Sequence, residues 1–327
     1  MPNTVTTLVA GLFLAGAASL ATAQETLTIG VQESGTVQWE IETIKALHLD
    51  EKHGITLDIR PLADSRAGQV ALLTGAVDVI LSDFVWVSLQ RADGNMVTMV
   101  PHSLAVGGLM VSQQSGIAAP ADLAGKTIAV AGGPVDKNWI ILQAWYNQAT
   151  DQNLVDDIRA NYGAAPLVNE LLATGSVDAA LNFWQWNARA KSAGMTELVS
   201  VASMLEDLGV SEQPPLLGWT FTDETTTEKT AALTAFLDAS FEAKSIMRSD
   251  DAVWFDLADL MVGKTDDLDL WAQLRDDYIA GIVSGYDPAN TGPAEETFAL
   301  LAQYGGSDLV GTQSELAPGT FWQGYRK

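Results

Sequence analysis

Five short polar segments carry most of the side chains that could do chemistry, and each follows a run that predicts a β-strand. They are Ser34-Gly35-Thr36, Asp64-Ser65-Arg66, Ser82-Asp83-Phe84, Gly132-Gly133-Pro134-Val135-Asp136-Lys137 and Asn182-Phe183-Trp184-Gln185. In open parallel α/β sheets, ligands bind beyond the carboxyl ends of the strands, where such loops gather. Several of these loops also enter helices, whose free backbone N–H groups can hold a carboxylate, a sulfonate or a carbonyl oxygen. The pattern favours the binding of a small molecule.

Tryptophans lie in the same loops or within a turn of them. Flat side chains there suit an organic ligand with an apolar or planar body, each contact adding about 0.5–1.5 kcal/mol beyond burial. Packing in the core is the alternative, and it is favoured for Trp139. Trp39 and Trp184 are nearest to strand ends and are the best candidates for ligand contact. Trp86 and Trp219 are candidates as well.

The sequence contains no recognisable motif of catalytic or metal-binding residues. The chain has no cysteine, which excludes thiolate catalysis, iron–sulfur clusters and cysteine-ligated zinc. His48 and His53 lie five residues apart, outside the spacing of an HExxH zinc motif, and His102 is isolated. Residues 125–127 read GKT, like the end of a phosphate-binding loop, but they precede a strand instead of following one. We therefore expect no enzyme, no cofactor and no metal site.

One unit that carries two of these loops occurs twice, one hundred residues apart. Residues 72–86 read LLTGAVDVILSDFVW and residues 172–186 read LATGSVDAALNFWQW. Each copy has the form of a helix end, a turn, a short buried strand and a loop. Two similar lobes with a cleft between them are the architecture that this repeat predicts.

Strand-like and helix-like runs alternate along the chain, which favours an α/β fold with parallel sheets covered on both faces. The expected strands are 27–31, 55–62, 77–81, 96–100, 108–111, 127–131, 157–162, 177–181, 197–201 and 216–221; late helices are expected at 226–248, 251–262, 266–282 and 293–304. We assign residues 24–104 and 212–327 to lobe 1 and residues 105–211 to lobe 2. The chain then crosses between the lobes twice, which would make a hinge.

The N-terminal segment and the net charge of the chain indicate its location and the partners that it is expected to bind. Residues 8–21 form a short apolar run, and Ala21-Thr22-Ala23 supplies the small-x-small pattern of a signal peptide cleaved after Ala23. Asp and Glu number 41 against 17 Lys and Arg, a formal charge of −24. Such a field repels phosphate polymers, so nucleic acid is not an expected partner.

Three segments carry a resemblance to a known family: Leu27–Val31, LLTGAVDVILSD at 72–83 and DLAGKTIAVAGG at 122–133. With them the chain resembles the periplasmic substrate-binding proteins of bacterial ABC importers, in the nitrate/sulfonate/taurine (SsuA/THI5-like) group that also includes thiamine-pyrimidine synthases. The resemblance implies a type II periplasmic-binding fold whose two αβα lobes close on a ligand by hinge bending. It also implies a monomer in the periplasm that delivers a small organic molecule, of planar or anionic character, to an ABC permease in the inner membrane.

The resemblance also places ligand contacts at Ser34, Thr36, Arg66, Asp83, Gly133, Asp136 and Asn182. The strand-end loops and the tryptophans add Trp39, Ser82, Phe84, Trp86, Pro134, Lys137, Trp184 and Trp219. The segments 82–84 and 182–186 are bulkier and less cationic than a dedicated sulfonate or nitrate pocket would suggest, so the sequence leaves the ligand open.

Two other functions are compatible with the resemblance. A periplasmic receptor could report its ligand to a sensor instead of a permease. An enzyme of the pyrimidine-synthase branch is disfavoured, because that branch carries a cysteine cluster that this chain lacks.

Overall fold

The computed structural model describes residues 24–33, 35–263 and 267–327. The predicted signal peptide with its cleavage after Ala23, and the predicted ligand contact Ser34, lie outside the described residues.

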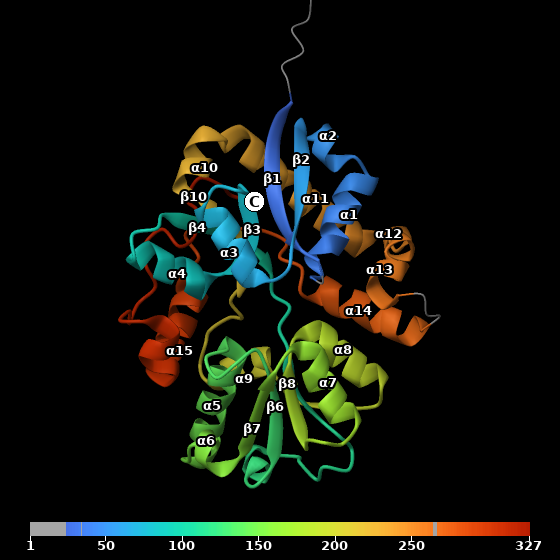
Figure 1. Cartoon of the computed structure of the whole chain (residues 1–327), viewed down its shortest axis with the longest axis vertical. Coiled ribbons are helices and arrows are strands. Elements are labelled where there is room, and N and C mark those ends of the chain that lie inside the picture. Colours follow the sequence, from blue (N-terminus) through green and yellow to red (C-terminus); the bar gives the residue numbers. More distant parts are fainter. Residues whose placement is uncertain (1–23, 34, 264–266) are drawn as a thin grey trace, which may run out of the picture.

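The first sheet is built mainly by the N-terminal part of the chain (Figure 1). Its strands follow the order β2-β1-β3-β10-β4, and β10 runs antiparallel to both of its neighbours. The N-terminal elements are β1 (Glu25–Gln32), α1 (Val37–Ala46), α2 (Leu49–Lys52), β2 (Ile55–Leu62), α3 (Ser65–Leu73), β3 (Val79–Asp83), α4 (Phe84–Ala92) and β4 (Val97–Ser103).

The second sheet repeats this arrangement with other strands. Its order is β7-β6-β8-β5-β9, and here β5 is the strand that runs antiparallel to both neighbours. Its elements are β5 (Gly108–Val111), the 3₁₀ helix η1 (Pro120–Leu123), β6 (Thr127–Ala131), α5 (Lys137–Thr150), α6 (Leu154–Asp157), β7 (Arg159–Gly163), α7 (Ala165–Ala173), β8 (Ala179–Asn182), α8 (Trp184–Ser192), β9 (Thr196–Ser200) and α9 (Val201–Asp207).

The C-terminal part returns to the first sheet and then adds helices. Its elements are β10 (Leu217–Thr222), α10 (Asp223–Glu228), α11 (Thr230–Ser249), α12 (Ala252–Asp256), α13 (Ala258–Val262), α14 (Leu268–Ala280) and α15 (Gly292–Val310). Helix α14 packs on α8 and α15 packs on α5, so both helices bridge the two halves of the molecule (Figure 1).

Two connections join the sheets, residues 104–107 and residues 208–216. The two-lobed α/β fold expected from the sequence is confirmed. The assignment of residues 24–104 and 212–327 to lobe 1 and of 105–211 to lobe 2 agrees with these connections, and its exact boundaries stay a prediction. In the part of the chain that the structure describes, no helix has both the length and the hydrophobicity needed to cross a membrane.

The two copies of the repeat fold alike. The helix of each copy, α3 or α7, ends before a glycine with positive φ, Gly75 (71°) or Gly175 (69°). A glycine is favoured there because a Cβ atom would strain the left-handed turn that ends a helix. The strands that follow, β3 and β8, are largely buried, and each is the central strand of its own sheet.

An aspartate fixes each copy to its sheet. The Oδ2 atom of Asp78 accepts a hydrogen bond from the backbone N–H of Thr28, and that of Asp178 accepts one from Thr127, each at 2.8 Å. In return, the N–H groups of the two aspartates donate to the carbonyl oxygens of the same threonines. The repeated Thr-Gly-x-Val-Asp sequence therefore sets the position of the strand that leads to the candidate site.

Two local predictions are corrected by the structure. The run 251–262 is not one helix, because α12 ends at Asp256 and α13 begins at Ala258. The run 226–248 is not one helix either, because α10 ends at Glu228 and α11 begins at Thr230.

Candidate ligand-binding cleft

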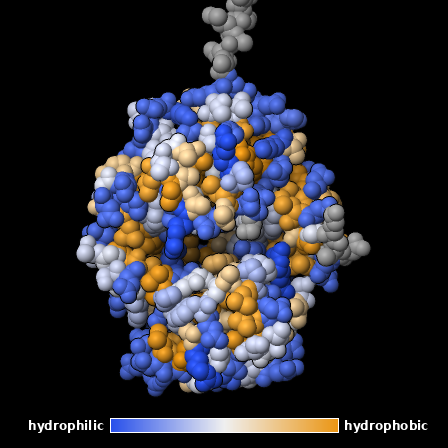
Figure 2. Space-filling model, viewed as in Figure 1, coloured by the Kyte–Doolittle hydropathy of each residue, from blue (hydrophilic) through white to orange (hydrophobic). Residues whose placement is uncertain are grey.

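A cavity of about 320 Å³ lies between the two lobes. Figure 2 shows the surface hollowed at this place, with apolar and polar residues around the opening. The upper wall comes from the carboxyl ends of β1, β2 and β3, and the lower wall from the first residues of α5 and α8. Residues 105–107 of one connection and Leu216 and Leu217 of the other complete the lining. The cavity therefore occupies the edge where parallel α/β sheets bind ligands.

Three helices begin at this cavity with an aspartate as N-cap. Asp64 Oδ1 accepts from the N–H of Ala67 at 2.8 Å, and Asp83 Oδ1 accepts from the N–H of Trp86 at 2.9 Å. Asp136 Oδ1 accepts from the N–H groups of Asn138 and Trp139, at 2.9 and 3.4 Å. Each carboxylate compensates backbone donors that have no partner in the first turn. All three aspartates also line the cavity.

Lys137 connects the two lobes across the cavity. Its Nζ lies 3.2 Å from Asp83 Oδ2, with Lys137 on α5 and Asp83 at the end of β3. Burial alone would lower the pKa of Lys137, but Asp83 and Asp136 raise it above its ordinary value, so the amine stays protonated. Burial raises the pKa of Asp136, and the nearby charge of Asp83 raises it further. Lys137 and the helix N–H groups lower this pKa but do not outweigh the increase.

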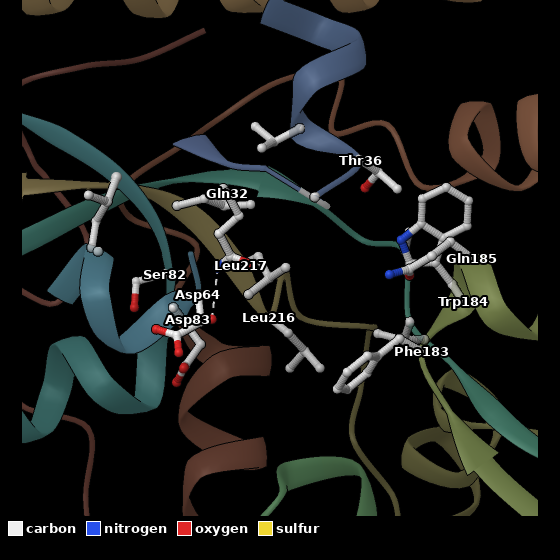
Figure 3. Close-up of a pocket in the computed structure, with 18 of the residues that line it drawn as sticks. Gln32, Thr36, Asp64, Ser82, Asp83, Phe183, Trp184, Gln185, Leu216 and Leu217 are labelled. Carbon is white, nitrogen blue, oxygen red and sulfur yellow. Dashed lines mark hydrogen bonds between the residues drawn. The ribbon is translucent and has the colours of Figure 1, made fainter. Parts of the chain in front are cut away.

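The other end of the cavity is uncharged (Figure 3). Figure 3 shows Asp64, Ser82 and Asp83 at one end, and Thr36, Trp184 and Gln185 at the other. Thr36 is the N-cap residue of α1 and Phe183 that of α8, and neither makes a side-chain capping hydrogen bond. The first-turn N–H groups of these two helices are therefore not capped by a side chain.

Trp184 reaches from α8 into a group of aromatic residues of the other lobe. Its ring lies 5.9 Å from that of Trp39 and 6.1 Å from that of Tyr278, both in edge-to-face geometry. Trp254 packs on Trp39 and Tyr278 from behind. We call Trp39, Trp184, Trp254 and Tyr278 the aromatic cluster. Trp39, Trp254 and Tyr278 hold the partly buried Trp184 at the place where it lines the cavity.

The sequence pattern of the NMT1/THI5-like family matches residues 51–250, more than half of the chain. The chain belongs to this family. A comparison with curated protein sequences finds no match.

Solved structures show the same fold. The periplasmic aliphatic sulphonate binding protein SsuA from Escherichia coli matches with a TM-score of 0.73 and 19% identity, over 91% of this chain and 92% of that one. The alkanesulfonate-binding protein SsuA from Xanthomonas axonopodis pv. citri, bound to MOPS, matches with a TM-score of 0.70 and 16% identity, over 92% and 99%. The desulfurization enzyme DSZB matches with a TM-score of 0.59 and 19% identity, over 86% and 92%.

In this member of the NMT1/THI5-like family, the cavity brings together part of the set of residues predicted from the sequence. The predicted residues that line it are Thr36, Ser82, Asp83, Asp136, Lys137 and Trp184. They come from both lobes, as a site between lobes requires.

Several predicted aromatic residues lie in the core instead. Phe84 is 0% exposed and packs against Phe321, and Trp219 is 1% exposed and donates from Nε1 to Ser240. Trp86 is partly buried against the main core, and Trp39 supports Trp184 from behind without lining the cavity. Nearness to a strand end does not decide the direction of a side chain, because successive residues point to opposite faces.

The other predicted contacts lie beside the cavity. Asn182 is buried, donates to the carbonyl oxygen of Ala165 at 2.9 Å and accepts from the N–H of Phe183, so it holds the loop before α8 in place. Gly133 and Pro134 lie in the loop before Asp136 but do not line the cavity. The side chain of Arg66 is exposed, because it follows the N-cap of α3 on the outer side of the helix.

Sequence reasoning missed the apolar part of the lining, formed by residues such as Gly30, Leu62, Ile80 and Leu216. Gly30 carried a usable signal, since a glycine inside a strand marks a close approach. A Cβ atom there would lie 2.5 Å from Leu62 Cδ1. The apolar residues gave no signal, because buried strands are apolar wherever they end.

A second polar group lies inside lobe 1, away from the cavity. Glu40 is fully buried, with His102 Nε2 at 3.0 Å, Lys244 Nζ at 3.6 Å and a hydrogen bond from Ser240. Burial would raise the pKa of Glu40, but Lys244, His102 and the hydrogen bonds outweigh it and lower the pKa to about 2. Tyr278 joins this group to the aromatic cluster, with Oη 3.4 Å from Glu40 Oε2.

His102 is neutral in this buried group. Burial lowers the pKa of His102, and the charge of Lys244 lowers it further. Glu40 raises this pKa but does not outweigh the other two effects. Its Nδ1 has no hydrogen-bond partner among the described residues, which fits a neutral ring that donates from Nε2 to Glu40. Within the described residues, no three His, Asp or Glu side chains are arranged to hold a metal ion.

Proposed function

We propose that this protein is the solute-binding component of an ABC importer, which captures a small organic molecule between its lobes and delivers it to a permease. The observation that carries the proposal is the cavity of about 320 Å³, whose walls come from both lobes of a two-sheet fold. Sites for small ligands are of this size or larger and combine apolar walls with a few polar groups.

Hinge closure couples binding to delivery. The lobes are joined by residues 104–107 and 208–216, and parts of both connections line the cavity. A ligand that touches both lobes stabilises the closed form by the difference between its affinities for the closed and open forms. The permease then recognises a surface that exists only when the lobes are together.

The ligand contacts in this proposal are Thr36, Ser82, Asp83, Asp136, Lys137 and Trp184, which line the cavity. The protein acts as a monomer in the periplasm after removal of residues 1–23. The similarity to the periplasmic E. coli protein supports this location, and so does the apolar run at residues 8–21.

The test uses the mature protein, residues 24–327, purified from the periplasm of its own cells. Native mass spectrometry is expected to show a bound small molecule, and small-angle scattering is expected to show a smaller radius of gyration when that molecule is added back. A protein that never retains a small molecule, and whose radius stays constant in a concentrated periplasmic extract, would contradict the proposal.

The likeness to DSZB favours one alternative, an enzyme acting on an organic sulfur compound in the same cavity. The ionisable residues that line the cavity are Asp64, Asp83, Asp136 and Lys137. The three aspartates serve as helix caps and Lys137 is paired with Asp83, so each has a structural partner. Incubation with biphenyl-2-sulfinic acid, the compound in one DSZB structure, separates the two functions: sulfite release by the purified protein would establish an enzyme.

A further inference from the structure

We infer that the ligand of this cavity carries a protonated nitrogen, an ammonium or amidinium group, on a small apolar or planar body. The inference rests on the proposed function and names its class of ligand. Its basis is the charge of the lining. Three carboxylates, of Asp64, Asp83 and Asp136, face the cavity, and among the described lining residues the one cation is Lys137. Three negative charges and one positive charge give the lining a formal charge of −2.

The helix N-termini at the charged end of the cavity disfavour an anion there. An anionic ligand is held at such ends by free backbone N–H groups. At α3, α4 and α5 the N-cap aspartate of this chain already accepts from one or two of those groups. A sulfonate or carboxylate placed there would meet that carboxylate at close range, where like charges in a partly buried site repel each other.

The same aspartates retain oxygen atoms for a cation. The Oδ2 atoms of Asp64 and Asp136 make no hydrogen bond to any described residue, while Asp83 Oδ2 pairs with Lys137 at 3.2 Å. A protonated nitrogen could donate to these oxygens without breaking a helix cap. Burial raises the pKa of Asp136, so the arrival of a cation would also stabilise the ionised form of that carboxyl.

The cationic side chains in and near the cavity do not offset the negative charge of its lining. Lys137 is engaged by Asp83, and the exposed Arg66 does not line the cavity. Arg189 donates to the carbonyl oxygens of Gln185 and Met261 and lies over the ring of Trp186. Arg189 does not line the cavity either.

The rest of the lining fits the body of such a molecule. Leu62, Ile80, Phe183 and Leu216 are apolar residues of the lining. Figure 3 shows Leu216 between Asp83 and Trp184. The charged nitrogen and the apolar body would therefore occupy separate parts of one cavity.

The experiment compares probes that differ only in the charge of one group. Benzylamine, benzyl alcohol and phenylmethanesulfonate form one set, and butylamine, butan-1-ol and butane-1-sulfonate form the other. Binding to residues 24–327 is measured by isothermal titration calorimetry at pH 7. The amine of each set is expected to bind at least tenfold tighter than its alcohol and its sulfonate. A sulfonate that binds as tightly as its amine would overturn the inference and leave the receptor function intact.

Variants of Asp64 and Asp83 test whether the preference for amines comes from these carboxylates. Asp64→Asn and Asp83→Asn remove a charge but keep a good N-cap, so the helices are retained. Each is expected to weaken amine binding at least fivefold and to strengthen sulfonate binding. The matched control is Asp93→Asn, an exposed residue at the other end of α4, with an expected change below twofold. Equal losses of amine affinity in the control and in Asp83→Asn would overturn the inference.

If no probe binds, the molecule released from the periplasmic protein on denaturation is passed over ion exchangers at pH 7. Retention on the cation exchanger supports the inference, and retention on the anion exchanger alone overturns it. Release of no small molecule at all counts against the proposed function itself.

Discussion

The two copies of the repeat, residues 72–86 and 172–186, share their scaffold and differ where they reach the cavity. Both have the helix-ending glycine and the aspartate that binds the neighbouring strand, Asp78 in one and Asp178 in the other. The next residues differ: Ser82-Asp83-Phe84 in lobe 1 stands opposite Asn182-Phe183-Trp184 in lobe 2. The shared glycine and aspartate hold the fold, and the segments 82–84 and 182–184, which differ, form or support the site.

The difference changes the roles of equivalent residues. In lobe 1 the polar Ser82 and Asp83 line the cavity and the aromatic Phe84 lies in the core. In lobe 2 the polar Asn182 is buried away from the cavity, and the aromatic Phe183 and Trp184 line it. One scaffold therefore presents an acidic edge from one lobe and an aromatic edge from the other, which gives a ligand two chemically different ends to bind.

The largest expected effect separates the equivalent aromatic residues. Phe84→Ala should lower the free energy of unfolding by about 3–5 kcal/mol, because a fully buried ring leaves a cavity. Trp184→Ala should cost less than about 2 kcal/mol, since its ring is only partly buried. The same variant should weaken binding of the periplasmic ligand at least tenfold. Urea unfolding and calorimetry measure both quantities, and a Trp184 variant as unstable as the Phe84 variant would make Trp184 a core residue.

A second difference lies on the first helix of each lobe. Glu40 on α1 binds His102 and Ser240 inside lobe 1, whereas the residue one hundred positions later, on α5, is the buried Ile140. Glu40→Gln should lower the free energy of unfolding by about 3 kcal/mol at pH 7, because it leaves Lys244 buried without its carboxylate. The exposed Glu42→Gln on the same helix is the control, with an expected change within about 0.5 kcal/mol.

The pH dependence of this group has a definite sign. The pKa of Glu40 is lowered from 4.5 to about 2, so its contribution to stability is complete above pH 4.5 and is lost as the pH falls through 2. The pKa of His102 is lowered from 6.5, which removes further stability as the pH falls below 6.5. Between pH 4.5 and pH 3 the wild type should therefore lose the contribution of Glu40, so that its stability advantage over Glu40→Gln shrinks. Parallel losses in both proteins would show that Glu40 does not contribute.

An intermediate loss of stability is expected when either of the shared aspartates, Asp78 or Asp178, is replaced, and it tests whether the two have the same structural role. Asp78→Ala and Asp178→Ala should each cost about 1–3 kcal/mol, because each leaves the N–H of Thr28 or Thr127 without its carboxylate. Asp78 also pairs with Lys229 Nζ at 2.7 Å, a partly exposed ion pair worth about 0–1 kcal/mol. Asp78→Ala should therefore be the more destabilising of the two in urea unfolding. A much smaller effect of Asp178→Ala would mean that the aspartates are not equivalent.

The sequence predicted what depends on local chemistry and on the repeat. The strands around Leu27 and Val79 and the two connections between the sheets are all found. Local patterns could not show which face Trp219 presents, since it lies within β10 and points into the core. They also could not bring Tyr278 beside Trp39, because α14 reaches α1 only through tertiary packing. The polar lining residues could be predicted because the end of each apolar strand marks where they stand, whereas apolar lining residues resemble any core residue.

The smallest effect concerns the start of the helix that precedes each repeated strand. Helix α3 begins after Asp64, whose side chain accepts from the N–H of Ala67, whereas α7 begins after Ala164, which cannot cap. Ala164 is exposed and has the extended backbone of an N-cap, with φ −66° and ψ 145°. Ala164→Asp should therefore raise the free energy of unfolding by about 0.5–1 kcal/mol, and Asp64→Ala should lower it by a similar amount. Ala164→Asn is the control, since it caps without a charge: an equal gain identifies capping, and a gain with Asp alone identifies the helix dipole. Loss of stability in both Ala164 variants would show that the lobes begin these helices by different means and that the likeness of the two copies starts only at the strand.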